Sequence, residues 1–169
     1  MSVLKHFKDI RLFVFDVEGV LTDGYLLLAE HGQPWLRLYA KDGPAISQAL
    51  AKGYRVVFLC AQHHEAVSQW LNSLGVTGIF KQGREGTARI LSLAAEQGVK
   101  PEEILYMGED PADIPLMKAV GLPCAPADGA AAVRACAQYI SSRKGGAGCI
   151  LDVITKVLQL QDDVGAGDA

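Results

Sequence analysis

Acidic side chains stand close together just after a short apolar segment near the start of the chain. In the stretch LFVFDVEGVLTDG, the apolar run 12–15 is followed by Asp16, Glu18 and Asp23 in a loop that contains glycine. Carboxylates that follow a buried strand are suited to bind a hard cation such as Mg²⁺, which prefers oxygen ligands, and to act on phosphate. The segment therefore predicts a metal and phosphate site. It also raises the question of why the second acid is Glu18 and not the shorter Asp.

A second acidic loop follows the apolar run EILYM and contains Glu109, Asp110 and Asp113. If both loops leave neighbouring parallel strands, they meet at the carboxyl edge of the sheet, where ligands bind in open α/β folds. The alternative is that these acids cap helix N-termini. Capping suits Asp113 and Asp42, but it accounts poorly for Asp16, which directly follows a buried strand.

The elements that must position these loops alternate along the chain. Apolar runs typical of buried parallel strands lie at residues 12–15, 55–59, 78–80, 104–107 and 123–125, with amphipathic stretches of helical length between them. This alternation predicts an α/β fold with a doubly wound parallel sheet. A chain of 169 residues that is half apolar can bury one core, so we expect a single domain over residues 1–161. The small, acidic tail 162–169 is predicted to be disordered.

Residues 25–39 interrupt the alternation. Two strand-like runs flank the turn sequence EHGQ, which predicts a β-hairpin inserted after the first strand. Its apolar side chains would form a patch large enough for a protein interface; they are Leu26, Leu27, Leu28, Trp35, Leu36, Leu38 and Tyr39. The alternative is a hairpin that folds back onto its own domain.

Composition excludes several classes of function. A net charge of -3 and a pI near 5.8 give no general attraction for nucleic acid or for an anionic membrane. No apolar run reaches the roughly 20 residues that span a bilayer, and the N-terminus is too polar for a signal peptide, so we expect a cytoplasmic protein. The four scattered cysteines have no metal-type spacing, which argues for reduced thiols and against zinc.

Together these motifs resemble the haloacid dehalogenase (HAD) superfamily of phosphohydrolases, and within it the branch that contains 3-deoxy-D-manno-octulosonate 8-phosphate (KDO 8-phosphate) phosphatase. FDVEGVLTDG is similar to the branch's D-x-D-G-V-L-T-D-G, and YMGEDPADIPLM to its G-D-D-x-x-D-x-x-x-M. GLPCAPADG and GGAG also fall where the branch has similar segments. The resemblance spans about residues 11–153. It implies a Rossmann-like HAD fold without a cap domain, Mg²⁺ as cofactor, a small phosphorylated sugar acid as substrate, and a homotetramer assembled through the hairpin.

The resemblance also implies roles for individual residues. Asp16 corresponds to the nucleophile that forms an aspartyl phosphate, and Glu18 to the acid that protonates the leaving group. Cys60 and Ala61 fall where phosphoryl oxygens are held, and Thr87 falls where the branch has a Lys. The implied metal ligands are Asp16, Glu18, Glu109 and Asp110.

Each of these chemical motifs departs from the branch. Glu18 is one methylene longer than Asp, which displaces its proton by about 1.5 Å. Cys60 is a weak donor in place of a hydroxyl group. Because Thr87 stands in place of a Lys, the site lacks the branch's main positive charge, unless a neighbouring basic residue contacts phosphate. The candidates are Arg84, Lys81 and Arg89.

The expected substrate clamp is altered as well, since Gln62 and Ala147 stand where the branch has arginines. Two functions therefore stay open with near-equal weight. One is a Mg²⁺-dependent phosphomonoesterase of weak or altered activity, and the other is a catalytically inactive HAD-fold protein that acts as an oligomeric scaffold or binds another ligand. A sensing module of response-regulator type is disfavoured by the inserted hairpin. His63 and His64 could face the site, but a solvated helix start is the simpler interpretation.

Overall fold

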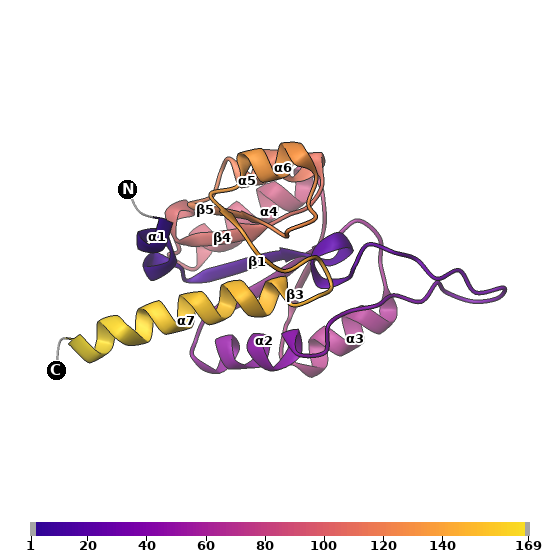
Figure 1. Cartoon of the computed structure of the whole chain (residues 1–169), viewed down its shortest axis with the longest axis horizontal. Coiled ribbons are helices and arrows are strands. Elements are labelled where there is room, and N and C mark those ends of the chain that lie inside the picture. Colours follow the sequence, from indigo (N-terminus) through magenta and orange to yellow (C-terminus); the bar gives the residue numbers. More distant parts are fainter. Residues whose placement is uncertain (1–2, 168–169) are drawn as a thin grey trace.

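Strand β1 (Leu12–Asp16) lies at the centre of a parallel sheet in the computed structural model, which describes residues 3–167 (Figure 1). The strand order is β3-β2-β1-β4-β5-β6. The other strands are β2 (Arg55–Cys60), β3 (Gly78–Lys81), β4 (Ile104–Met107), β5 (Leu122–Ala125) and β6 (Tyr139–Ile140). The predicted doubly wound α/β fold is confirmed, and five strands match the predicted runs. The two-residue strand β6 was not predicted, because it is too short to give a pattern.

Helices cover both faces of the sheet (Figure 1). One face carries α2 (Asp42–Ala51), α3 (Glu65–Ser73) and α7 (Cys149–Gly167), with α1 (Val3–Asp9) packed against α7. The other face carries α4 (Arg84–Glu96), α5 (Ile114–Met117) and α6 (Ala131–Cys136). Short 3₁₀ turns at Pro101–Glu103 (η2) and Pro111–Asp113 (η3) flank β4. Both faces are thus covered, which explains why the strands read as continuous apolar runs.

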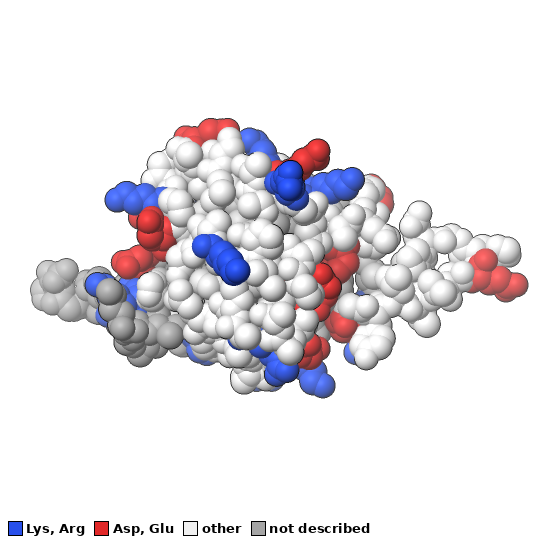
Figure 2. Space-filling view, turned by 90° about the horizontal axis from the view of Figure 1, so that it is seen from above, with Lys and Arg blue, Asp and Glu red and all other residues white. Residues whose placement is uncertain are grey.

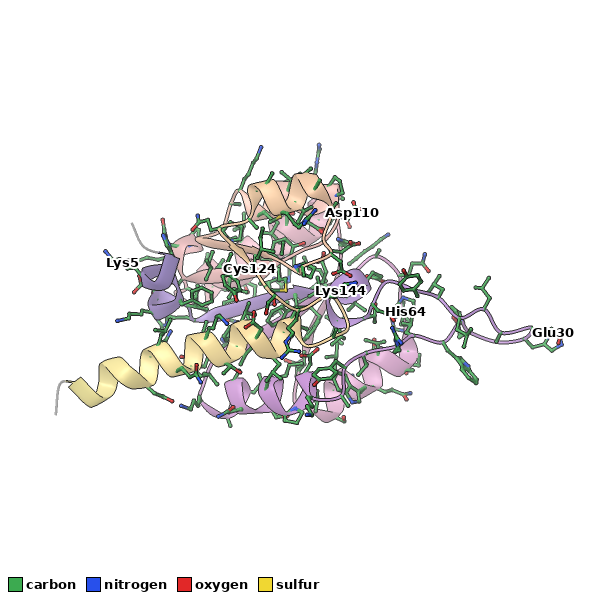
Figure 3. All side chains as sticks on the ribbon, in the orientation of Figure 1. Lys5, Glu30, His64, Asp110, Cys124 and Lys144 are labelled. Carbon is green, nitrogen blue, oxygen red and sulfur yellow. The ribbon has the colours of Figure 1, made fainter. Side chains whose placement is uncertain are left out.

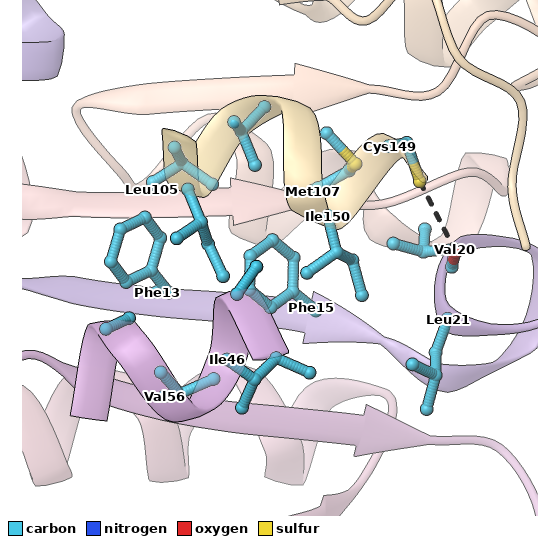
Figure 4. Close-up of a cluster of buried hydrophobic side chains, with 14 of the residues drawn as sticks. Phe13, Phe15, Val20, Leu21, Ile46, Val56, Leu105, Met107, Cys149 and Ile150 are labelled. Carbon is cyan, nitrogen blue, oxygen red and sulfur yellow. Dashed lines mark hydrogen bonds between the residues drawn. The ribbon is translucent and has the colours of Figure 1, made fainter. Parts of the chain in front are cut away.

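All five residues of β1 are buried, and successive side chains point to opposite faces. Phe13 and Phe15 pack in the core with α2 and α7, whereas Leu12 and Val14 belong to the core under α4. In the first core, the Cys149 thiol at the start of α7 hydrogen-bonds the Val20 carbonyl (3.3 Å; Figure 4). The two cores fix β1 from both sides, so its carboxyl end has a defined position.

The inserted segment projects from the body as a narrow hairpin (Figure 1). Leu27 and Trp35 exchange backbone hydrogen bonds of 3.1 and 3.0 Å, and a second antiparallel bridge joins Thr22 to Leu38. The antiparallel pairing is as predicted, but it consists of isolated bridges and not of continuous strands. Leu36 and Leu38 pack against the main core. Tyr25, Leu26, Leu27, Leu28 and Trp35 are exposed, so this part of the hairpin does not fold back onto the domain.

Helix α7 continues to Gly167, past residue 161 where the sequence predicts the folded domain to end. The last two residues of the predicted disordered tail lie outside the described part. Within residues 3–167, no helix combines the length and the apolar character needed to cross a bilayer.

Asp42 links two helices on one face of the sheet. It lies in the first turn of α2, is fully buried, and accepts a hydrogen bond from the Leu151 N–H in the first turn of α7 (2.9 Å). The predicted capping role is therefore correct, but the capped helix is α7 and not α2. The second carboxylate oxygen of Asp42 has no partner among the described residues. Burial raises the pKa of Asp42 to about 6.

This buried carboxyl group predicts a specific pH dependence of stability. Because the pKa is raised in the folded state, the folded protein binds more protons than the unfolded chain between about pH 4 and pH 6. The contribution of Asp42 is thus favourable at low pH and is lost as pH rises through 6. We expect the free energy of unfolding of the wild type to fall by roughly 2–3 kcal/mol relative to Asp42→Asn between pH 4 and pH 7. Urea denaturation at both pH values tests this, and a pH-independent difference between the two proteins would contradict it.

Candidate active site

Asp16 ends β1 with its side chain buried, 1% of its surface being exposed. The Tyr106 hydroxyl in β4 donates to Oδ1 (2.9 Å), and the Gln82 amide after β3 donates to Oδ2 (3.2 Å). The pKa of Asp16 lies well above its usual value, chiefly because the carboxylate is buried and also because Asp113 and Glu18 are negatively charged neighbours. The predicted nucleophile is therefore held by donors from two other strand segments.

Gln82 also connects Asp16 to the second acidic loop. Its amide nitrogen donates to Asp113 Oδ1 (2.5 Å) as well as to Asp16. The other oxygen of Asp113 accepts hydrogen bonds from the Glu109 and Asp110 N–H groups (2.9 and 2.8 Å). Asp113 and Asp110 form the reciprocal capping box of η3. The capping interpretation is thus correct for Asp113, which at the same time orders the loop beside Asp16.

Glu109 brings the two acidic loops together. The loop after β1 reaches Gly19, which has a φ of 72°, and a Cβ atom there would lie 2.3 Å from Glu109 Cγ. Only glycine allows this approach. The pKa of Glu109 is raised by burial and by the charges of Asp110, Asp113 and Asp128. The acidic loops meet at one edge of the sheet, as their positions after neighbouring strands predict.

These acids form a suitable but loosely arranged donor set for a cation. Among the side chains that the structure describes, no three of Asp, Glu, His or Cys are close enough to form a ready metal site. Among the described ion pairs, none joins Lys or Arg to Asp16, Glu109 or Asp110. Glu109, whose pKa is raised by burial and by neighbouring carboxylates, lies in surroundings whose negative charge a hard cation would relieve. Asp16, Glu109 and Asp110 thus supply the oxygen ligands that Mg²⁺ prefers, but they are not drawn together into a complete site, and the Mg²⁺ site stays a prediction.

Glu18, the fourth predicted ligand, holds its carboxylate elsewhere. Oε2 accepts a hydrogen bond from the Ala61 N–H (3.0 Å), and Oε1 accepts one from the Gln62 N–H (3.3 Å). His64 Nε2 lies 3.1 Å from Oε1. The His64 side chain is only 10% exposed, whereas that of His63 is 73% exposed. A solvated helix start is therefore correct for His63 and wrong for His64, which lies at the base of the hairpin (Figure 3).

Cys60 ends β2 close to Glu18 and Asp16, but its thiol hydrogen is directed at a backbone carbonyl. Its thiol is 3.6 Å from the Phe80 carbonyl, and it donates in that direction. Burial raises the pKa of Cys60, and the charges of Glu18 and Asp16 raise it further. The predicted phosphate-binding position thus holds a neutral thiol whose weak donor is already used.

None of the candidate cations has a described contact with Asp16. Thr87 is half-buried in the first turn of α4, and Arg84 at the start of that helix is exposed. Arg89 lies over the Phe80 ring, 5.3 Å from its centre, and pairs with Glu96 (3.3 Å). Lys81 is exposed at the end of β3. Figure 2 shows acidic side chains gathered where the largely uncharged hairpin leaves the body. The site is acidic, and no described contact brings Arg84, Lys81 or Arg89 to Asp16.

Sequence reasoning missed Tyr106 and Gln82 as site residues, and it considered His64 but preferred a solvated helix start. A tyrosine inside the buried run EILYM is a usable signal, because a buried hydroxyl group requires a partner. Gln82 gives no such signal, since an amide in a loop has no characteristic spacing. The contact between His64 and Glu18 joins the start of α3 to the loop after β1, and no local sequence pattern predicts it.

Known proteins resemble this chain along most of its length. A sequence profile of haloacid dehalogenase-like hydrolases matches residues 78–154. The 3-deoxy-D-manno-octulosonate 8-phosphate phosphatase KdsC of Yersinia pestis is 28% identical over 95% of this chain and 86% of its own.

Solved structures have the same fold. A probable YrbI-family phosphatase from Pseudomonas syringae superimposes with a TM-score of 0.89 and 31% identity, over 98% of this chain and 94% of the other. The cobalt-bound form of the deoxy-D-mannose-octulosonate 8-phosphate phosphatase from Haemophilus influenzae superimposes with a TM-score of 0.86 and 27% identity, over 93% and 92%. The α/β fold of this chain agrees with these matches. This chain therefore belongs to the haloacid dehalogenase-like hydrolase family, and the relatives that it matches include KDO 8-phosphate phosphatases.

Proposed function

We propose that this chain is a Mg²⁺-dependent phosphomonoesterase of low activity that acts on a small phosphorylated sugar acid. The observation that carries the proposal is the buried Asp16, whose two oxygens are fixed by Tyr106 and Gln82 at the carboxyl edge of the sheet. The names of the relatives support the substrate class, and the cobalt-bound relative supports a divalent cation.

In the proposed reaction, an Asp16 oxygen attacks phosphorus and the bond to the substrate alcohol breaks, which forms an aspartyl phosphate. The departing alcohol oxygen takes a proton from Glu18. A water molecule then attacks phosphorus and gives a proton to the Glu18 carboxylate, while the bond between phosphorus and Asp16 breaks and Asp16 leaves as a carboxylate. Tyr106 and Gln82 orient Asp16 during both steps. A cation held by Asp16, Glu109 and Asp110 would offset the charge of the phosphoryl oxygens.

Low activity follows from the groups that surround phosphate. Cys60 donates to the Phe80 carbonyl, and Glu18 is engaged with the loop after β2. No described contact places a lysine or arginine beside Asp16. The same observations favour a second candidate, a catalytically inactive protein of this fold that serves as an oligomeric scaffold or binds another ligand.

Both candidate functions, the phosphatase and the inactive scaffold, include association between copies of this chain. The hairpin exposes large apolar side chains that water solvates poorly, namely Tyr25, Leu26, Leu27, Leu28 and Trp35. Closed symmetry would bury them between copies, so we propose a homotetramer formed through the hairpin.

Turnover can be tested with a generic aryl phosphate in the presence of Mg²⁺. We expect slow hydrolysis by the wild type and none above background by Asp16→Asn, because the amide is not a nucleophile. Phosphate release and a circular dichroism spectrum would be measured for both proteins. Equal activity of the two folded proteins would exclude Asp16 as the nucleophile, and no wild-type turnover would favour the scaffold.

The missing phosphate contacts can be restored together. We expect Glu18→Asp alone to raise kcat/KM less than tenfold, because the phosphate-holding groups stay absent. Adding Cys60→Thr and Thr87→Lys should raise it by more than about 10²-fold, since one oxyanion stabiliser is typically worth 10²–10³ and such groups act as a unit. No gain from the triple variant, with fold and metal binding intact, would show that the deficit lies at other positions such as Gln62 and Ala147.

Light scattering coupled to gel filtration tests the assembly. We expect a tetramer at micromolar concentration for the wild type and smaller species for Leu27→Asp, because the buried charge would oppose association. Ile140→Asp is the matched control, since Ile140 is an exposed apolar residue outside the hairpin. A monomeric wild type would contradict the proposed assembly.

A further inference from the structure

Three hydrogen-bond donors converge on the Glu18 carboxylate. Two are the consecutive backbone N–H groups of Ala61 and Gln62, and the third is the His64 ring. All three belong to the loop after β2 and the start of α3, whereas Glu18 comes from the loop after β1. The Glu18 side chain thus connects the loop after β1 to the loop after β2.

The same two N–H groups are suited to hold a phosphoryl group. Consecutive N–H groups that point into a site form an anion-binding concavity, and these two lie at the carboxyl edge of a parallel sheet. They directly follow Cys60, whose thiol lies close enough to both Glu18 and Asp16 for their charges to raise its pKa. A phosphoryl group under attack by Asp16 would have to lie beside this loop. A carboxylate and a phosphate cannot share the same donors, because both are anions.

His64 has no role in its own helix that would explain its position. It is the N-cap residue of α3, but its side chain makes no capping hydrogen bond. Its ring is nine-tenths buried and is directed at Glu18. Both Glu18 oxygens already accept a backbone N–H, so this geometry favours the His64 tautomer that carries its hydrogen on Nε2. One side of the ring borders a cavity of about 730 Å³ between the hairpin and α3, which Trp35 and Trp70 also line.

We propose that His64 is a positioning residue that holds the Glu18 carboxylate on the Ala61 and Gln62 N–H groups, where it competes with the phosphoryl group. This inference rests on the proposed function only in naming phosphate as the competing anion. It explains why Glu is present at this position, since the extra methylene lets the carboxylate reach the loop after β2. Binding of phosphate then requires that Glu18 leave these donors.

Titration calorimetry with inorganic phosphate in excess Mg²⁺ tests the proposal without turnover. We expect His64→Phe, which keeps a ring but removes the donor, to bind phosphate about tenfold more tightly than the wild type. His64→Gln keeps a donor and should stay within about twofold of the wild type. His63→Phe is the matched control, because His63 is exposed and contacts Glu65 instead. Equal affinities of His64→Phe and His63→Phe would overturn the proposal.

Glu18→Ala provides a second test that does not depend on the ring. It frees both N–H groups, so phosphate should bind at least tenfold more tightly. The amide NMR signals of Ala61 and Gln62 should shift on phosphate addition at lower concentrations than in the wild type. Because His64→Phe leaves the charge of Glu18 in place, a gain there separates position from simple charge removal. Unchanged affinity in Glu18→Ala would overturn the proposal.

The two proposals can fail separately. Tighter phosphate binding by His64→Phe without any Asp16-dependent turnover would refute the enzymatic function and support the positioning role. Asp16-dependent turnover with unchanged phosphate affinity in both variants would do the reverse.

Discussion

A carboxylate buried at the end of a central strand requires hydrogen-bond donors, since burial of an unpaired charge is costly. Asp16 receives them from Tyr106 in β4 and from Gln82 after β3, and the same Gln82 amide reaches Asp113. The strand order places β1 between β2 and β4, which brings these segments to one edge. The arrangement of both acidic loops therefore depends on how this one buried group is satisfied.

The fold brings acidic side chains together at the site, but no described basic side chain balances their charge. The strand ends and the glycine turn after β1 bring acids together, but the described contacts include no basic side chain at Asp16 to balance them. Glu18 reduces the resulting repulsion by turning to backbone N–H groups, which carry partial positive charge. The described side chains around Asp16 thus leave an excess of negative charge, which disfavours a phosphate without a cation. The length of the Glu18 side chain lets its carboxylate accept hydrogen bonds from the loop after β2.

The features predicted from the sequence are those with a local cause. Five strands and the place of Asp16 follow from apolar runs and from the rule that ligands bind at the carboxyl edge of such sheets. The contacts of His64, Tyr106 and Gln82 join residues far apart in the chain, and no spacing reveals them. Asp42 was predicted to cap a helix, but the identity of that helix depends on how α7 packs. Strand β6 has two residues and gives no periodic pattern.

The central position of β1 has a consequence for how the protein is made. Synthesis produces β1 early, but one of its edges stays unpaired until β4, about ninety residues later, leaves the ribosome. During that interval β1 can pair with β2 alone, and its other edge is open to other chains. The donor Tyr106 lies on the late strand, so Asp16 becomes enclosed only when the sheet closes around it. Enclosure of the site is therefore a late event of folding, and incomplete chains leave one edge of this apolar central strand exposed.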